Sequence, residues 1–451
     1  MSDTIASKPS EFRLNTPADQ FWKVLNVPAI WTTGWLLICC CTFMNLADFK
    51  VDKSQVNVDL QVLIKLGLVV CGGLYGLHGL ISNRRVQQVM GSFPVLWIVV
   101  ISFFYFVAVL GSHSPAHSLA SALSIQCILL MTVTALVHMG VKNVISAMLC
   151  GMSLFVCLSW LAYFAVPELG VLQEKLPEGK IAHRMSGLAH ANTLGQYSGI
   201  TVVLIVVLIA TYRVRSRFVL LLGLLALGAL VNSLSRTSMM ATMIALVIGY
   251  RHIFIRREHI KFYIVGGAVA LLMVLIASTQ FDVNKKLVSK LSFLSKSGDT
   301  EELTTATGRS EIWNYSLILL QKKPLTGYGA ATQKHFLADY SYYTHNLVLN
   351  VAFSSGIFGG IACLCMVFGR IKAMFRNRHP LADAVTVFIL VNGIFENVIF
   401  SVVAGMPTMI WIIALCWPLL TDDPVVSSGQ RNLPDDKSGT DERFLRLGVS
   451  G

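Results

Sequence analysis

Arginine and histidine side chains stand where several apolar segments begin, and there they could bind an anion. Arg236 starts one such segment, Arg309 starts an amphipathic one, and His345 starts a third. The N-terminal end of a helix is electropositive, so a cation is normally disfavoured there. A bound anion would reverse this, because helix amides and guanidinium groups can act together on one phosphate cluster. The pattern indicates an anion-binding site, and a diphosphate is the ligand that we expect there.

A looser example of the same pattern precedes another apolar segment. Arg184 and His190 stand before it, and Asn192 lies at its mouth. A single arginine at a membrane surface usually reaches for lipid headgroups, and a single histidine is usually a polar end group. Because four such positions recur at helix ends of one kind, we interpret them as a shared site.

The elements that would position these residues are membrane helices. The chain has 451 residues, of which 54% are hydrophobic and 13% charged, whereas soluble domains carry about 25% charged residues. Apolar runs of about twenty residues recur along the chain and predict an all-α, polytopic membrane protein. We expect twelve spans, at residues 27–47, 59–81, 92–111, 118–139, 144–166, 191–212, 218–234, 237–254, 262–281, 345–368, 381–402 and 404–420.

The net charge of +12 comes from cations in short connectors, which favours membrane orientation over nucleic-acid binding. By the positive-inside rule the basic connectors are cytoplasmic; they hold Arg84, Arg85, Lys142, Arg213, Arg215, Arg217, Arg251, Arg256, Arg257, Lys261, Arg370, Lys372, Arg376 and Arg378. Both termini are then cytoplasmic, and the long segment 282–344 faces outside. The predicted organisation is a cytoplasmic segment 1–26, a membrane domain 27–420 and a disordered cytoplasmic tail 421–451.

Two neighbouring spans are short and meet at residues 233–238. A single long buried helix is the alternative to a hairpin. We favour the hairpin, because a single helix would place the arginine-rich connectors at 213–217 and 251–261 on opposite sides of the membrane. Ser235 is the candidate N-cap of the second helix.

Within the long outer segment, residues 307–313 begin a short amphipathic helix. Its apolar positions, Ile312, Trp313, Leu317 and Leu320, follow helical spacing. Pro324 ends it, and the glycines at 327 and 329 turn the chain. Thr344 is the candidate cap of the helix that His345 opens.

Glu396 lies inside an apolar span, where a carboxylate is costly. Two interpretations remain open for it: a functional role, or a structural partner within the helix bundle. The eleven histidines are too scattered for a metal site, and all ten cysteines lie in apolar runs, so we expect no metal, no cofactor and no disulfide framework.

Several motifs share this order, spacing and predicted outer side: Ser235-Arg236-Thr237-Ser238, Thr307-Gly308-Arg309 with Glu311-Ile312-Trp313, Pro324-Leu325-Thr326-Gly327-Tyr328-Gly329, and His345-Asn346 before Gly356, Gly359 and Gly360. Together they resemble the O-antigen ligase and O-antigen polymerase superfamily, which includes exopolysaccharide polymerases. The resemblance covers residues 180–370.

This resemblance implies a bacterial inner-membrane glycosyltransferase that takes a glycan from undecaprenyl diphosphate on the periplasmic face. It implies no metal and inversion at the transferred sugar. By the family motifs, Arg236 and Arg309 would bind the diphosphate, and His345 would stand beside the reacting centre. Arg184 and His190 match a looser pattern and, with Asn346 and Glu311, are expected to contact substrate.

The leaving diphosphate gains negative charge in the transition state, so fixed guanidinium groups would stabilise it. A neutral His345 could remove the proton of the attacking sugar hydroxyl, with Glu311 as the second candidate base. In the opposite assignment, protonated His345 binds the phosphate.

The sequence also leaves the identity of the acceptor open: a ligase uses the lipid A core, whereas a polymerase uses another lipid-linked repeat.

A lipid-linked oligosaccharide flippase is the competing class of protein. Transporters place polar residues near the bilayer midplane, whereas here these residues stand at helix mouths and in outer loops. We therefore favour an enzyme, with membrane lipids and other polysaccharide-assembly proteins as expected partners.

Overall fold

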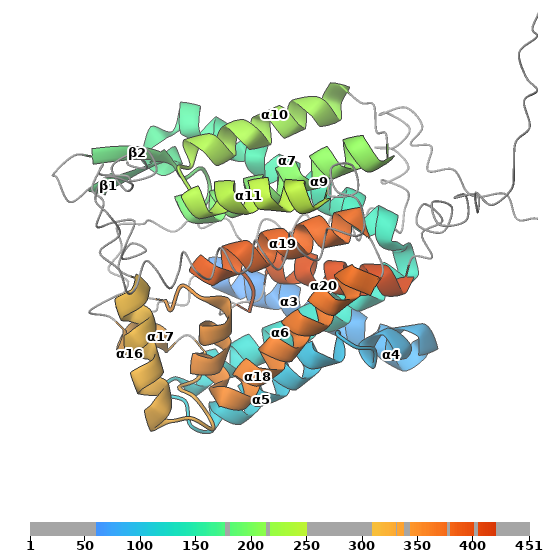
Figure 1. Ribbon diagram of the computed structural model, residues 1–451, viewed down its shortest axis with the longest axis vertical. Helices are drawn as coiled ribbons and strands as arrows, with labels where there is room; N and C mark the ends of the chain where they lie inside the picture. Colours follow the sequence, from blue (N-terminus) through green and yellow to red (C-terminus); the bar gives the residue numbers. More distant parts are fainter. Residues whose placement is uncertain are drawn as a thin grey trace, which may run out of the picture. The chain divides into compact units, whose positions relative to one another are not determined.

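Helices form at nearly all of the apolar runs that the structure describes. The computed structural model describes residues 60–175, 181–212, 217–249, 309–330, 332–337, 343–376, 379–400 and 405–420. The longer helices, labelled in Figure 1, are α3 (Leu60–Ser82), α5 (Leu96–Val109), α6 (Pro115–Met139), α7 (Val141–Ala165), α9 (Ala191–Tyr212), α10 (Arg217–Asn232), α11 (Arg236–Gly249), α18 (Leu347–Arg376), α19 (Pro380–Phe395) and α20 (Met406–Leu420). The predicted spans 27–47 and 262–281, the terminal segments 1–26 and 421–451, and most of segment 282–344 lie outside the described residues.

Among the described helices, four are long and apolar enough to cross a membrane: Pro115–Met139, Val141–Ala165, Ala191–Ala210 and Leu347–Arg376. A fifth is added if the bent pair formed by α3 and α4 (Arg84–Met90) is one span. The remaining apolar helices are shorter. The chain is thus mostly helical with several candidate membrane spans, and the number twelve stays a prediction.

The connector predicted at Arg84 and Arg85 is instead a helix. Asn83 is extended, and its side-chain oxygen accepts from the backbone N–H of Arg85 at 2.9 Å, so it caps α4. Helix α4 leaves α3 at an angle of 107°. The two arginines therefore begin a helix, because the cap provides a partner for an amide that a helix start would leave unpaired.

The prediction of an all-α fold missed one pair of short strands, in a segment that was predicted to face outside. Strands β1 (Val171–Lys175) and β2 (Ile181–Met185) pair antiparallel after the short helix α8 (Pro167–Gly170), with Leu172 opposite Arg184. The N–H groups of Ser186 and Gly187 both donate to the Gly170 carbonyl, at 2.9 and 3.1 Å. These bonds fold the strand pair back towards the start of α9.

Helices α10 and α11 are separate, in agreement with the two-helix interpretation of residues 218–254. The chain reverses at Leu234, whose φ of 51° is left-handed, and both helices pack against α9. A side chain at Gly195 would collide with Ser235. Glycine at this position therefore lets the start of α11 lie directly against the first turns of α9.

Helix α18 is broken at Gly356, which has φ 79° and ψ 179°. The break frees backbone groups that bond to the loop 324–329. Tyr328 N–H donates to the Phe353 carbonyl at 2.8 Å, Gly329 N–H donates to the Ser354 carbonyl at 3.0 Å, and Ile357 N–H donates to the Pro324 carbonyl at 2.7 Å. The loop thus completes the broken helix and joins it to α16 (Arg309–Lys322), as Figure 1 shows.

Helix α18 also runs further than its predicted span, so Arg370 lies inside it rather than in a connector. Arg370 is fully buried, donates to Asp383 of α19 at 2.8 Å and to the Thr386 hydroxyl at 3.0 Å. Its predicted placement in a connector was wrong; inside the helix, its charge is balanced by a carboxylate on the next helix.

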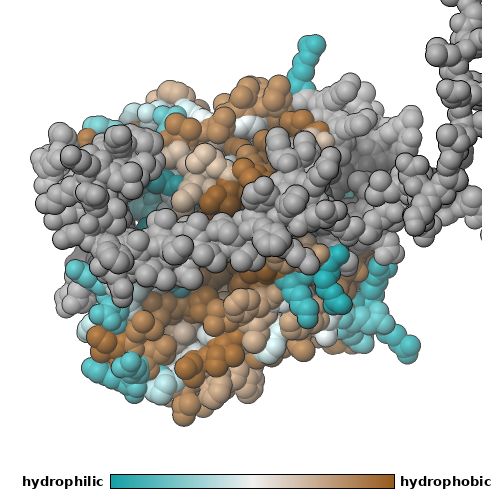
Figure 2. All heavy atoms as spheres, viewed as in Figure 1, coloured by the Kyte–Doolittle hydropathy of each residue, from teal (hydrophilic) through white to brown (hydrophobic). Residues whose placement is uncertain are grey.

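Apolar side chains cover much of the described surface. Figure 2 shows hydrophobic residues where α10, α18 and α5 reach one face of the molecule. Exposed members of this set include Leu220, Leu224, Phe368 and Phe103. Such a surface is costly in water and is suited to lipid.

Candidate functional site

Glu396 is the centre of a polar cluster at the end of α19. The helix ends at Phe395, and Glu396 is already extended. Its carboxylate accepts three hydrogen bonds: from Arg309 Nη2 at 2.8 Å, from Asn192 Nδ2 at 3.1 Å and from His345 Nδ1 at 3.0 Å. Only 11% of the Glu396 side chain is exposed. Residues from three distant parts of the chain therefore meet on one carboxylate.

Arg309 reaches this cluster because the buried face of α16 packs against the protein and Trp313 bonds to the turn before α18. The helix was predicted from its spacing, and among the described residues it runs from Arg309 to Lys322. Its buried face consists of Ile312, Ser316 and Leu319, while Leu317, predicted to pack, is 49% exposed. Trp313 Nε1 donates to the Thr344 carbonyl at 2.9 Å. The helix is thereby tied to the residue next to His345.

His345 lies just before α18 rather than within it. The helix begins at Leu347, and its cap is Asn346, whose side-chain oxygen accepts from the Leu349 N–H at 2.9 Å. The predicted cap Thr344 was wrong, since its hydroxyl instead donates to Asn397 at 3.3 Å. His345 has a φ of 49°, a strained conformation that is concentrated at functional sites in proteins.

The bond from His345 to Glu396 fixes the chemistry of the ring. An ionised carboxylate can only accept, so Nδ1 carries the proton in this pair and Nε2 carries the lone pair when the ring is neutral. The side chain of His345 is 24% exposed, and that of Arg309 is 17% exposed. The cluster is therefore partly dehydrated and still reachable from solvent.

Two further residues act on this cluster by charge, Arg236 on Arg309 and His190 on Glu396. Burial lowers the pKa of the Arg309 guanidinium from its ordinary value; the Glu396 carboxylate opposes this, and the positive charge of Arg236 lowers it further. His190 acts on Glu396 by charge, as do His345 and Arg309. The structure thus brings together Arg236, Arg309, His190 and His345. A site with more cationic groups than carboxylates is suited to an anion.

Arg184 is joined to the cluster through Asn192. Its side chain is 3% exposed and donates to the Ser233 carbonyl at 2.9 Å, to Glu174 at 2.8 Å and to Asn192 Oδ1 at 2.6 Å. Arginine can only donate, so the amide oxygen of Asn192 must face it and the amide nitrogen must face Glu396. Arg184 therefore joins the strand pair, the α10–α11 turn and α9.

Two other predicted residues are placed away from the carboxylate. Glu311 is exposed, and it stands two positions after Arg309, which puts it on another side of α16. Asn346 is used in capping α18, and its Nδ2 donates to the Ile394 carbonyl at 3.1 Å. Asn346 thus contributes to the shape of the His345 turn.

The central role of Glu396 was not predicted from the sequence. Its signal was present, because a lone carboxylate in an apolar run needs partners. The sequence could not identify Arg309, Asn192 and His345 as those partners, since they lie 87, 204 and 51 positions away along the chain.

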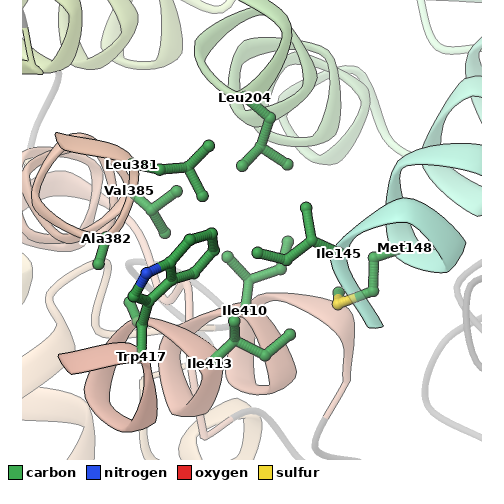
Figure 3. A pocket seen from close by; sticks show the side chains of 10 residues that line it. Ile145, Met148, Leu204, Leu381, Ala382, Val385, Ile410, Ile413 and Trp417 are labelled. Atoms are coloured by element: carbon green, nitrogen blue, oxygen red, sulfur yellow. The ribbon is translucent and has the colours of Figure 1, made fainter. Parts of the chain in front are cut away.

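An apolar cavity lies elsewhere, between α7, α9, α19 and α20. Figure 3 shows the side chains that line it, which include Ile145, Leu204, Val385 and Trp417. Leu381 and Val385 belong to the first turns of α19, whereas Glu396 follows its last turn. The cavity is thus at the other end of α19 and offers no charged group to a phosphate.

Comparison with known families agrees with the motifs. Residues 221–364 match a family described as O-antigen ligase. The match contains Arg236, Arg309 and His345, and it ends before Glu396. No curated protein matches the chain. Over residues 221–364, the match confirms the resemblance to the O-antigen ligase and polymerase superfamily.

Proposed function

We propose that this protein is a glycosyltransferase of cell-surface polysaccharide biosynthesis in the bacterial inner membrane. It takes a glycan from an undecaprenyl-diphosphate carrier on the periplasmic face. The observation that carries the proposal is the shared carboxylate: Glu396 binds Arg309 and His345 at 2.8 and 3.0 Å. A cation suited to a leaving phosphate and a base suited to an attacking hydroxyl are thereby held at one point.

In the proposed reaction, an acceptor hydroxyl attacks the anomeric carbon of the donor sugar. The bond between that carbon and the phosphate oxygen breaks, and its electron pair leaves with the diphosphate. Arg309 and Arg236 stabilise the charge that develops there, which favours the transition state over the ground state. The proton of the hydroxyl passes to Nε2 of His345.

Glu396 has two roles in this scheme. It orients the imidazole by accepting from Nδ1, and it stabilises the imidazolium that forms when Nε2 takes the proton, as a buried carboxylate does in other base-dependent enzymes. It also fixes one nitrogen of Arg309, while the planar guanidinium has five N–H donors in total. The opposite role for His345, as a protonated phosphate ligand, uses the same contacts.

The test is a transfer assay with purified protein and an undecaprenyl-diphosphate-linked repeat, with and without a lipid A core acceptor, in the presence of a chelator. Growth by repeat units without the core acceptor identifies a polymerase. Transfer only to the core identifies a ligase. No product in either arm, from protein shown to be folded, contradicts the proposal and supports a flippase.

A further inference from the structure

Both neighbours of His345 donate a hydrogen bond to the same atom. The Thr344 hydroxyl donates to Asn397 Oδ1 at 3.3 Å, and the Asn346 backbone N–H donates to that oxygen at 3.2 Å. Thr344 is fully buried. The side-chain oxygen of Asn397 therefore binds the residues on both sides of His345.

Asn397 is itself held in one orientation. A backbone N–H can only donate, so the side-chain oxygen of Asn397 must face Asn346 and its nitrogen must face away. That nitrogen donates to Asn350 Oδ1 at 3.3 Å. Asn350 Oδ1 also accepts from Gln333 Nε2 of α17 (Gln333–Phe336), and Asn350 Nδ2 donates to the Phe400 carbonyl at 3.5 Å. Buried polar groups thus hold Asn397 in the orientation in which it binds the His345 turn.

The turn at His345 needs such a support. A left-handed φ of 49° is unfavourable for a residue with a Cβ atom and persists only when its surroundings enforce it. Glu396 and Asn397 are adjacent in the chain, and each provides part of this support. Glu396 binds the ring of His345, and Asn397 binds the two flanking residues.

We propose that Asn397 is a positioning residue, which holds the His345 turn so that the imidazole meets Glu396 in the reactive orientation. This inference rests on the proposed function for its catalytic consequence. Its geometric content, that Asn397 controls the placement of His345, can be tested independently of any activity.

The first experiment measures the rate at which diethyl pyrocarbonate modifies His345, by peptide mass spectrometry on intact protein in detergent. In Asn397→Ala the turn loses the two hydrogen bonds that Asn397 accepts. The rate at which His345 is modified should then rise about threefold or more, because the ring gains freedom. The exposed residue His183, on β2, is an internal reference and should keep its rate. Asn143→Ala is the matched control, because it removes an amide that donates one bond to the Met139 carbonyl.

The second experiment measures transfer kinetics. Asn397→Ala should lower kcat about 10- to 100-fold with little change in the KM for the donor, since a small misplacement of a catalytic group costs this much. In a His345→Gln background the same substitution should change kcat less than about twofold, because residues that act as one unit are not additive. Thr344→Val, which removes one of the two donors, should give a smaller loss in kcat and a smaller rise in reactivity.

The outcomes separate the two proposals. An unchanged rate at His345 in both Asn397→Ala and Thr344→Val overturns the positioning role, whether or not the protein transfers glycan. Equal losses of kcat in the wild-type and His345→Gln backgrounds also overturn it, because they indicate general damage to the fold. An inactive wild-type protein whose His345 reactivity responds to Asn397→Ala contradicts the proposed function and leaves the positioning role supported. If Asn397→Ala does not fold, Thr344→Val provides both measurements.

Discussion

Two carboxylates, one after the last turn of α19 and one in its first turn, bind cationic or ionisable side chains, and the two groups differ in access to solvent. At one end, Glu396 binds His345 and Arg309, whose side chains are 24% and 17% exposed. At the other end, Asp383 binds Arg370, and the two side chains are 2% and 0% exposed. Both carboxylates stand in apolar sequence. Under the proposed function, access to solvent, rather than the presence of a buried charge, distinguishes the reacting site from the structural pair.

The number of elements that converge on each pair differs as well. Among the hydrogen bonds described for Arg370 and Asp383, Arg370 of α18 donates to Asp383 and Thr386 of α19, and Asp383 also accepts from the His379 N–H just before α19. Glu396 collects residues from α9, α16 and the turn before α18. A closed two-helix pair stabilises packing, whereas a carboxylate shared by several elements can also respond to a bound substrate.

Breaking the closed pair should have the largest effect. Arg370→Met leaves Asp383 buried without its charged partner, which should destabilise the fold by about 3–5 kcal/mol. Such a loss is comparable with the net stability of many domains, so little folded protein is expected in detergent by size-exclusion chromatography. The double variant Arg370→Met with Asp383→Leu should recover most of it, and no recovery would contradict the comparison.

Removing the base at the open pair should leave the fold intact and stop the chemistry. His345→Ala should lower glycan transfer about 10³-fold, within the range known for general bases. Protein yield and thermal midpoint should stay close to wild type. A transfer rate near that of the wild type would exclude His345 from the reaction.

Neutralising Glu396 and Asp383 in turn compares the effects of the two carboxylates of α19 on activity and on thermal stability. Glu396→Gln keeps the shape and weakens the hold on Arg309 and His345, so kcat should fall about 100-fold through misplacement with a small change in thermal midpoint. Asp383→Asn is the matched variant at the closed end, and it should lower the midpoint more. The reverse ranking of midpoints would show that the open pair is the structural one.

At the proposed site, the smallest loss of kcat is expected when Arg309 keeps its charge and changes only its geometry. Arg309→Lys cannot form a planar two-pronged contact with phosphate and should lower kcat about tenfold, equivalent to about 1.4 kcal/mol, while Arg309→Ala should abolish transfer. Lys334→Ala, on α17, should change activity less than about twofold, as surface substitutions usually do. An equal loss in Lys334→Ala would indicate a general effect of positive charge.

Part of this arrangement could be predicted from the sequence. Apolar length predicted the positions of the described helices. Cations at helix starts led to the prediction of one site for Arg236, Arg309, His190 and His345; of these, Arg309 and His345 bind one carboxylate in the structure. Sequence patterns gave no warning that Arg184 would be enclosed by Glu174, Asn192 and Ser233. Such contacts depend on tertiary packing, which periodicity does not encode.

Local turn chemistry was the other source of error. Thr344 and Asn346 are both acceptable caps by residue type, and the choice between them depends on Asn397, about fifty positions later in the chain. The strand pair at residues 171–185 carries charged and polar residues in both strands, so its alternation is too weak to stand out beside the apolar helices.

The break in α18 at Gly356 has a consequence for motion. Loop 324–329 bonds to both sides of the break, and at the other end of α16 Trp313 bonds to the turn that carries His345. Helix α16 and residues 347–355 are thus fastened together at two separated points. These attachments resist relative motion of the two elements, so under the proposed function we expect Arg309 and His345 to keep their spacing when a substrate binds.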